Sequence, residues 1–222
     1  MWKVELEPIA DWLNTLDHKS RVQILAAVSL LEEQGPDLKR PIVGKIKGSS
    51  LIPSMKELRP GSSGRSEIRI LFVFDPKRKA IMLVGGDKQR KWDKWYRKAI
   101  PEAERRYRMA GGAVRKGDGP MSYTPERFMA DSGITRDEVE AEKRRMLEEI
   151  RLYELKEARK AEHVTQKRLA QALGVSQKRI SVIESGDVDH IKVDTLKRYL
   201  EGIGGTLHVT ASLPGGKELR LV

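Results

Sequence analysis

Three cationic side chains at strand-like segments are the residues best placed for chemistry in the first half of the chain. Arg59 ends one such segment, Arg69 lies inside the next, and Lys88 follows the third. Because side chains alternate between the two faces of a strand, Arg69 points away from the face of its apolar neighbours Ile68 and Ile70. Several cations can therefore share one concave surface of a sheet, where they would attract a polyanion such as a nucleic acid.

The pattern of apolar residues places these cations in a small α+β domain. Alternation predicts strands, and helical spacing predicts helices. The strands are expected at 2–7, 56–59, 67–75 and 80–84, and the helices at 9–16, 20–33 and from about 89. Turn-forming residues at 60–64 and 76–79 join the last three strands into an antiparallel meander.

A second set of functional residues lies in the segment 165–186, which predicts two short helices and a tight turn. Thr165 caps the first helix, Gly174 permits the turn and Ser176 caps the second helix. The buried face would consist of Leu169, Ala170, Leu173, Val175, Ile180 and Ile183. In such a motif the second helix exposes polar side chains to base edges, while Gln166 and Lys167 can meet phosphates. The expected DNA-binding residues are Gln166, Lys167, Ser176, Gln177, Lys178, Arg179 and Ser181.

This segment closely resembles the helix-turn-helix of the Xre/phage-repressor family, whose consensus runs T-Q-x-x-L-A-x-x-L-G-V-S-Q-x-x-I-S-x-I-E-x-G. One position departs from the pattern, since Val182 stands where many members carry a polar base-contacting residue. The resemblance implies a DNA-binding repressor that acts as a homodimer on an operator.

Composition divides the chain into parts with different net charge. The formal net charge is +9 over 1–110, −2 over 121–162 and +3 over 163–222. The glycine-rich stretch 111–120 predicts a linker, and Met121 directly after it resembles a second translational start. A long helix is expected at 136–160, an additional helix at 194–203 and a terminal β-hairpin from 206 to the end of the chain. An acidic segment between two basic ones suggests that one part of the chain covers another.

The first 108 residues resemble HigB-like toxins of the RelE superfamily. The resemblance is carried by Glu57-Leu58-Arg59, by Glu67-Ile68-Arg69-Ile70-Leu71-Phe72, by Gly85-Gly86-Asp87-Lys88 and by the helix with Trp and Tyr residues that follows. The Xre-type segment supports it, because HigB toxins are paired with Xre-type HigA antitoxins. The sequence thus predicts a toxin at 1–110, a linker at 111–120, a toxin-docking antitoxin segment at 121–162 and a DNA-binding domain at 163–222.

The resemblance implies an endoribonuclease that cleaves mRNA without a metal ion, usually on the ribosome. By position, Arg69 matches an arginine that binds the scissile phosphate, Lys88 a basic residue that assists the leaving group, and Tyr96 a tyrosine proposed as base. Arg59 is either a fourth member of this site or an ion-pair partner of Glu57 or Glu67. Tyr96 also fits simple core packing beside two tryptophans. Further contacts to RNA are expected from Lys77, Arg78, Lys79, Arg90 and Lys91.

The composition also limits the other functions. The chain has no cysteine and four histidines that are not clustered, so thiol chemistry is excluded and neither a metal site nor a cofactor is expected. No apolar run approaches a membrane span, which predicts a cytoplasmic protein without a membrane partner. Two alternatives remain open: a transcription regulator whose basic first half only binds nucleic acid or protein, and a DNA-processing phage protein.

Overall fold

The computed structural model describes residues 1–61, 67–88, 92–109, 123–185 and 191–221 of the chain. These residues form two compact units, Met1–Leu147 and Glu148–Val222. The expected linker at 111–120 lies outside the described residues. Within the described parts of the chain, no helix is both long and apolar enough to cross a membrane.

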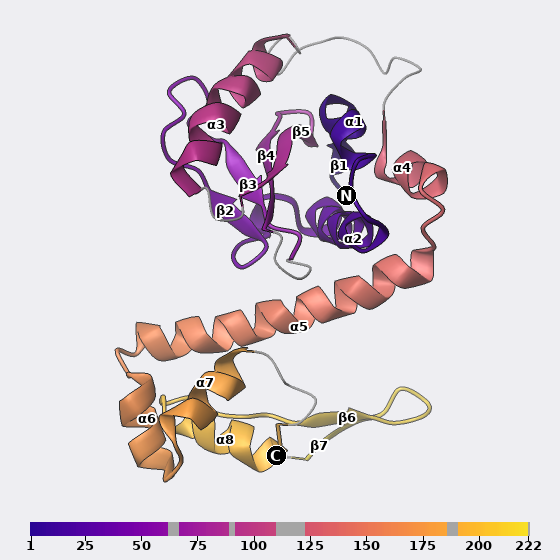
Figure 1. Cartoon of the computed structure of the whole chain (residues 1–222). Coiled ribbons are helices and arrows are strands. Elements are labelled where there is room, and N and C mark those ends of the chain that lie inside the picture. Colours follow the sequence, from indigo (N-terminus) through magenta and orange to yellow (C-terminus); the bar gives the residue numbers. More distant parts are fainter. Residues whose placement is uncertain (62–66, 89–91, 110–122, 186–190, 222) are drawn as a thin grey trace. The chain divides into compact units, whose positions relative to one another are not determined.

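The first unit contains most of the regular elements (Figure 1). They follow the chain as β1 (Lys3–Glu5), the 3-10 helix η1 (Glu7–Ile9), α1 (Ala10–Leu13), α2 (His18–Gln34), the 3-10 helix η2 (Gly35–Asp37), β2 (Val43–Lys45), β3 (Lys56–Leu58), β4 (Ile68–Phe74), β5 (Lys79–Asp87), α3 (Trp92–Met109), α4 (Pro125–Asp131) and α5 (Arg136–Ala161), which continues into the second unit.

The strands form one five-stranded sheet in the order β1-β5-β4-β3-β2. The neighbours from β5 to β2 are antiparallel, whereas β1 lies parallel to β5. The expected antiparallel meander is confirmed, but the sheet as a whole is mixed. A parallel neighbour needs a long crossover, and the chain from β1 to β5 supplies it through α2 and the meander.

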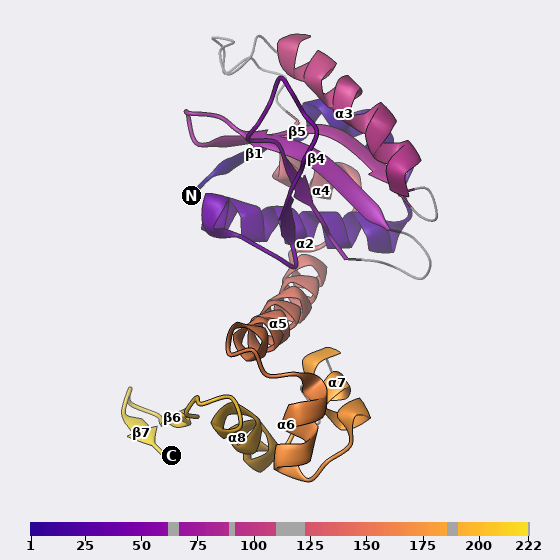
Figure 2. The same cartoon turned by 90° about the vertical axis from the view of Figure 1, so that its left-hand side faces the viewer.

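Helices cover both faces of this sheet, with α2 on one side and α3 on the other (Figure 2). Leu71, Val73 and Leu83 pack with Ala99 and Ala103 of α3 into one apolar core. The opposite face is closed by the apolar side of α2, along which most residues are buried. The continuous apolar run of β4 follows from this arrangement, because a strand covered on both faces loses the alternation of a half-exposed one.

Strand β2 and helix α4 of the first unit were not expected from the sequence. Strand β2 has only three residues and includes Gly44, and so it gives little periodic signal. Helix α4 begins after Thr124, whose side chain accepts a hydrogen bond from the backbone N–H of Arg127 at 3.3 Å, and it has Pro125 in its first turn. Proline in the first turn is favourable, but seven residues are too few for helical spacing to show.

The second unit is mainly helical and ends in a hairpin. After the last part of α5 come α6 (Gln166–Leu173), α7 (Gln177–Ser185), α8 (Val193–Glu201), β6 (Thr210–Ser212) and β7 (Glu218–Arg220). Its core consists of Leu169, Ala170, Ile180, Ile183, Tyr199 and Ile203. The expected α+β fold with a mostly helical second part and a terminal hairpin is confirmed.

Candidate functional site

A buried carboxylate lies at the centre of the cations in the first unit. Glu57 of β3 is fully buried, and its Oε1 lies 2.5 Å from Nε of Arg59 and 3.5 Å from Nε of Arg69. Tyr96 of α3 donates its hydroxyl to the second carboxylate oxygen, Oε2. Glu57 lies on β3 and Arg59 follows two residues later, directly after the strand, so their side chains share a face, and Arg69 comes from the neighbouring strand β4. We call Glu57, Arg59, Arg69, Lys88 and Tyr96 the Glu57 cluster.

Lys88 completes the cluster from the end of β5. It is 3 % exposed, its Nζ lies 3.9 Å from Oε2 of Glu67 and 6.0 Å from the centre of the Tyr96 ring. Burial, followed by the positive charge of Arg69, lowers the pKa of Lys88, while Glu57 and Glu67 oppose the shift. A lysine with a lowered pKa gives up its proton more readily than an exposed one.

Tyr96 is held in its protonated form. Burial raises its pKa, and so does its hydrogen bond to the Glu57 carboxylate. A free phenolate at Tyr96 is therefore disfavoured, and the hydroxyl acts as a hydrogen-bond donor in this structure.

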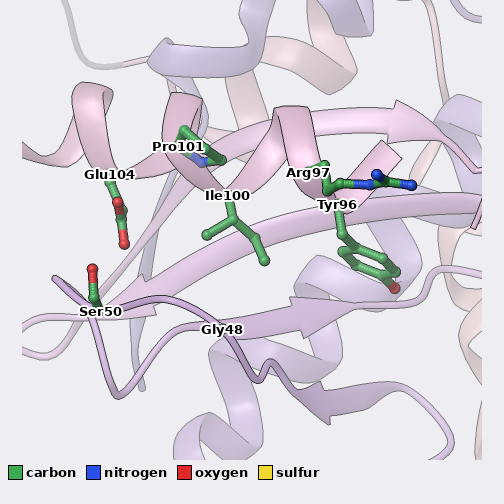
Figure 3. Close-up of a pocket in the computed structure, with 7 residues that line it drawn as sticks. All are labelled: Gly48, Ser50, Tyr96, Arg97, Ile100, Pro101 and Glu104. Carbon is green, nitrogen blue, oxygen red and sulfur yellow. The ribbon is translucent and has the colours of Figure 1, made fainter. Parts of the chain in front are cut away.

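The cluster borders an open groove between α3 and the loop before β3 (Figure 3). Its volume is about 790 Å³, and the lining residues are Gly48, Ser50, Tyr96, Arg97, Ile100, Pro101 and Glu104. At the end away from Tyr96, Glu104 accepts hydrogen bonds from Ser49 Oγ at 2.7 Å and from the backbone N–H of Leu51 at 3.2 Å. These bonds fix the loop against α3, so that one wall of the groove is tied to the other.

Two glycines allow the cluster to lie close to the sheet. A Cβ atom on Gly44 would come within 2.7 Å of Nη2 of Arg59, and one on Gly86 within 2.3 Å of Nε1 of Trp95. A Cβ at either position would force a neighbouring side chain to move. The Arg59 guanidinium and the Trp95 ring thus use space that these glycines leave open.

Three of the expected RNA-binding residues lie away from the Glu57 cluster. Lys77, Arg78 and Lys79 lie at the β4–β5 turn, at the end of these strands opposite to Lys88. Arg90 and Lys91 lie outside the described residues. Glu57 was expected from the sequence only as one of two possible ion-pair partners of Arg59, and the structure places it at the centre of the cluster.

The second unit contains the expected helix-turn-helix. Thr165 and Ser176 accept hydrogen bonds from the backbone N–H groups of Arg168 and Arg179, each at 3.1 Å, and Gly174 has a φ of 65°. The side chains expected to read DNA are exposed at the start of α7, namely Gln177, Lys178, Arg179 and Ser181.

A second buried carboxylate, that of Glu184 on α7, connects this helix to α5, α6 and α8. Glu184 accepts hydrogen bonds from Arg159 at 2.5 and 3.0 Å, from the Tyr199 hydroxyl at 2.7 Å and from Nε2 of Gln166 at 2.9 Å. Burial acts to raise the pKa of Glu184, but these bonds outweigh it and the pKa is lowered. Gln166, expected at a DNA phosphate, is half-buried and its side-chain amide is bonded to Glu184. We call these four residues the Glu184 network.

The segment after the expected linker packs on the first half of the chain within the first unit. The backbone carbonyl of Tyr123 accepts a hydrogen bond from the N–H of Leu6 at 2.9 Å, and Phe128 of α4 is fully buried. On α5, Glu138 lies 2.8 Å from Nε2 of His18 and Lys143 is paired with Glu33. Both contacts lie on α2, which covers the face of the sheet opposite to α3 (Figure 2). We call residues 123–147 the docking segment.

The fold and these two sites define a class of protein in which a basic α+β domain precedes a helix-turn-helix domain. Comparison with protein families identifies both parts: residues 11–108 match the family of phage-derived Gp49-like proteins, and residues 155–209 match a helix-turn-helix family.

Named relatives give the same division. The chain is 50% identical over 103 residues to toxin HigB2 of Mycobacterium tuberculosis. This match covers 46% of this chain and 51% of HigB2. It is 44% identical over 101 residues to toxin HigB3 of the same organism, a match that covers 46% of this chain and 85% of HigB3. It is 38% identical over 93 residues to antitoxin HigA2 of that organism, a match that covers 42% of this chain and 92% of HigA2. The chain therefore spans about half the length of HigB2, but most of HigB3 and HigA2.

A solved structure is also similar to part of the chain. The structure described as DNA-bound antitoxin HigA3 is 39% identical, with a TM-score of 0.27, over 30% of this chain and 85% of that one. The chain belongs to the HigB/HigA toxin–antitoxin family, with a HigB-type domain first and a HigA-type helix-turn-helix domain second.

Proposed function

We propose that the first domain is a metal-independent endoribonuclease that cleaves mRNA on the ribosome, and that the second part neutralises it and represses transcription at an operator. The Glu57 cluster is the observation that carries the proposal. It gathers two arginines and a lysine of lowered pKa around one carboxylate, next to an open groove. Such a group of cations stabilises the negative charge that develops on a phosphate under attack.

The reaction would be an attack of a ribose 2′-oxygen on the adjacent phosphorus, with loss of the 5′-oxygen of the next nucleotide. Arg59 and Arg69 would bind the non-bridging oxygens of the pentacoordinate intermediate. Lys88 would give its proton to the leaving 5′-oxygen, as its lowered pKa favours.

The proton of the 2′-hydroxyl needs an acceptor, and the geometry supports a relay. Tyr96 would take this proton while its own hydroxyl proton passes to the Glu57 carboxylate to which it is bonded. No free phenolate forms in such a relay, which agrees with the raised pKa of Tyr96. The groove along α3 would hold nucleotides beside the scissile phosphate, with Ile100 and Pro101 as its apolar floor.

The second part would bind operator DNA as a dimer through the exposed side chains of α7. Because Gln166 is bonded to Glu184, we assign it to positioning α7, while Gln177, Lys178 and Ser181 contact base edges. Lys167, Ser176 and Arg179 would contact the backbone nearby.

Neutralisation would operate through the docking segment. It covers α2, whereas the Glu57 cluster lies on the α3 face of the sheet. We therefore propose that the antitoxin part keeps the toxin off the ribosome by its bulk and leaves the cluster uncovered.

Expression of residues 1–110 in bacteria tests the proposal. Growth should stop, recover when 121–222 is co-expressed, and continue with 1–110 carrying Arg69→Ala. Free growth with soluble, folded 1–110 would contradict the proposal and favour a domain that only binds nucleic acid. With an RNA that residues 1–110 cleave without ribosomes, cleavage by the full chain as well would support exclusion from the ribosome, and loss of cleavage in the full chain alone would indicate that the cluster is blocked.

A further inference from the structure

The groove beside the Glu57 cluster has opposite charges at its two ends. Arg97 lies at the end with Tyr96, and Glu104 lies at the other end, further along α3 (Figure 3). Two turns of helix separate Arg97 from Glu104, so both side chains leave the same face of α3, about 10 Å apart along its axis. A ligand with negative charge at one end and hydrogen-bond donors at the other end would therefore match the groove.

Glu104 is fixed in position and in its ionised form. Its Oε1 accepts hydrogen bonds from Ser49 Oγ at 2.7 Å and from the backbone N–H of Leu51 at 3.2 Å. The bond from Ser49, followed by the bond from Leu51, holds the pKa of Glu104 below its ordinary value. Because both bonds are made to Oε1, the second carboxylate oxygen, Oε2, can accept from a ligand in the groove.

A carboxylate at this place favours guanine over the other bases of RNA. The Watson–Crick edge of guanine has two neighbouring donors, N1–H and the N2 amino group, which one carboxylate can accept together. Adenine and cytosine turn an acceptor nitrogen toward the same place, and uracil has a single donor between two carbonyl oxygens. Bases of single-stranded RNA are read at this edge, and a buried polar group that is left unpaired disfavours the wrong base.

We propose that the groove selects guanine in the RNA substrate, with Oε2 of Glu104 accepting from N1–H and N2–H of the base. The hydroxyl of Ser50, which faces Glu104 across the groove, donates to O6 of the same base (Figure 3). Arg97 binds the phosphate of this nucleotide, while Ile100 and Pro101 pack against the flat face of the base. The inference rests on the proposed function and adds a sequence preference to it.

The charge of Glu104 also determines which part of an RNA strand lies at its end of the groove. A phosphate there would be repelled by the carboxylate, so the RNA backbone passes the end with Arg97. The distance from the phosphate to the Watson–Crick edge of an extended guanine nucleotide is close to the separation of Arg97 and Glu104. One nucleotide therefore spans the groove, and its phosphate lies beside Tyr96 and the rest of the Glu57 cluster.

Binding of short RNAs that cannot be cleaved tests the proposal on the full chain. The probes are labelled 2′-O-methyl oligouridines with a guanine, adenine or cytosine in the middle, and all proteins carry Gln177→Ala and Lys178→Ala to weaken the helix-turn-helix. The parent should bind the guanine probe about tenfold more tightly than the others. Glu104→Gln should reduce this preference below twofold, because the amide keeps an oxygen for Ser49 and puts a donor in place of Oε2.

Base analogues identify the edge that is read. Inosine lacks the N2 amino group and should bind the parent several-fold more weakly than guanine, whereas 7-deazaguanine keeps the Watson–Crick edge and should bind within twofold of guanine. In Glu104→Gln, guanine and inosine should bind equally. Weak binding of 7-deazaguanine together with full binding of inosine would mean that a cation reads the N7 edge, and the proposal would be wrong.

A matched variant separates the role of Glu104 from general charge and from folding. Glu102→Gln removes another carboxylate of α3, one that is paired with Arg105 and Arg106, and it should keep the guanine preference. If Glu104→Gln weakens binding of all probes equally, Glu104 only ties the loop to α3 and the proposal is overturned. A guanine preference lost equally in Glu102→Gln would overturn it as well.

The outcome is independent of cleavage. Guanine-selective binding that depends on Glu104, in a chain whose residues 1–110 cleave no RNA, would contradict only the proposed function. RNA cleavage that depends on Arg69 but is accompanied by equal binding of all probes would contradict only the guanine site.

Discussion

The two units contain nearly the same buried arrangement, a glutamate bonded to an arginine and a tyrosine, with different surroundings. Glu184 accepts from Arg159, Tyr199 and Gln166, and all four side chains belong to packed helices. Glu57 accepts from Arg59 and Tyr96, but Arg69 and Lys88 add positive charge that it does not balance. The same triad thus holds helices together where the charges cancel, and it lies at the proposed catalytic site where Glu57 alone does not cancel them.

The largest effect is expected from breaking the Glu184 network. Glu184→Ala leaves Arg159 buried without its carboxylate, which typically costs about 3–5 kcal/mol. The second unit should melt earlier, as thermal unfolding followed by circular dichroism would show, and lose operator binding with it. Glu201→Ala, an exposed glutamate on α8, is the control. A similarly small effect for both would mean that packing alone holds α7.

Removal of Arg69 should abolish function and leave the fold intact. Arg69→Ala should lower the rate of RNA cleavage by residues 1–110 by about 10²–10³-fold, since it removes one group that stabilises the transition state. Its melting temperature should change little, because Glu57 keeps Arg59. Arg105→Ala, an exposed residue paired with Glu102, should cleave at the normal rate. A large loss of stability in Arg69→Ala would make the Glu57 cluster a structural network like that of Glu184.

Gln166 and Gln177 allow a side chain bonded to the buried carboxylate to be compared with one expected to contact DNA, within the same helix-turn-helix. Gln177→Ala or Lys178→Ala should cost about 1–3 kcal/mol of operator affinity each, with non-specific binding unchanged. Gln166→Ala should lower thermal stability and leave base preference unchanged, because it removes a bond to Glu184. Binding to operator variants by fluorescence anisotropy distinguishes the two. An altered base preference in Gln166→Ala would mean that Gln166 contacts DNA after all.

Glu32 shows what a half-buried carboxylate does when its main charged neighbours are also acidic. Burial, followed by Glu126 of α4, raises its pKa to about 7, against an opposing bond from the backbone of Val4. The folded state therefore keeps a proton that the unfolded state loses near pH 4.5, so stability should fall from pH 4.5 to 7 and then level off. Glu32→Gln should flatten this profile in urea unfolding. An unchanged profile would mean that Glu32 is already ionised in the folded chain.

The sequence predicted the elements with long periodic segments and the site residues that lie on them. Arg69 could be assigned to a face of β4 because alternation is a local property. The partner of Arg59 could not be chosen between Glu57 and Glu67, because it depends on the register of β3 against β4. The role of Glu57 was missed for the same reason, since only the fold brings Tyr96 of α3 to its carboxylate.

The helix-turn-helix was predictable almost residue by residue, because caps, turn and buried face lie within about twenty positions. Gln166 is the exception. Its partner Glu184 is eighteen residues away and inside the core, which a pattern of exposed positions does not reveal. The separation of Lys77, Arg78 and Lys79 from the Glu57 cluster could be seen only in the fold. The two ends of β5 are close in sequence but lie at opposite ends of the sheet.

The bond between Leu6 and Tyr123 joins parts of the same molecule, and this affects how the contact responds to dilution. A contact within one chain has an effective concentration set by the length of the connecting chain, whatever the number of molecules in the cell. Two separate proteins would part as they are diluted, whereas the docking segment stays beside α2. A free copy of 121–222 added from outside would have to exceed that local concentration to replace it.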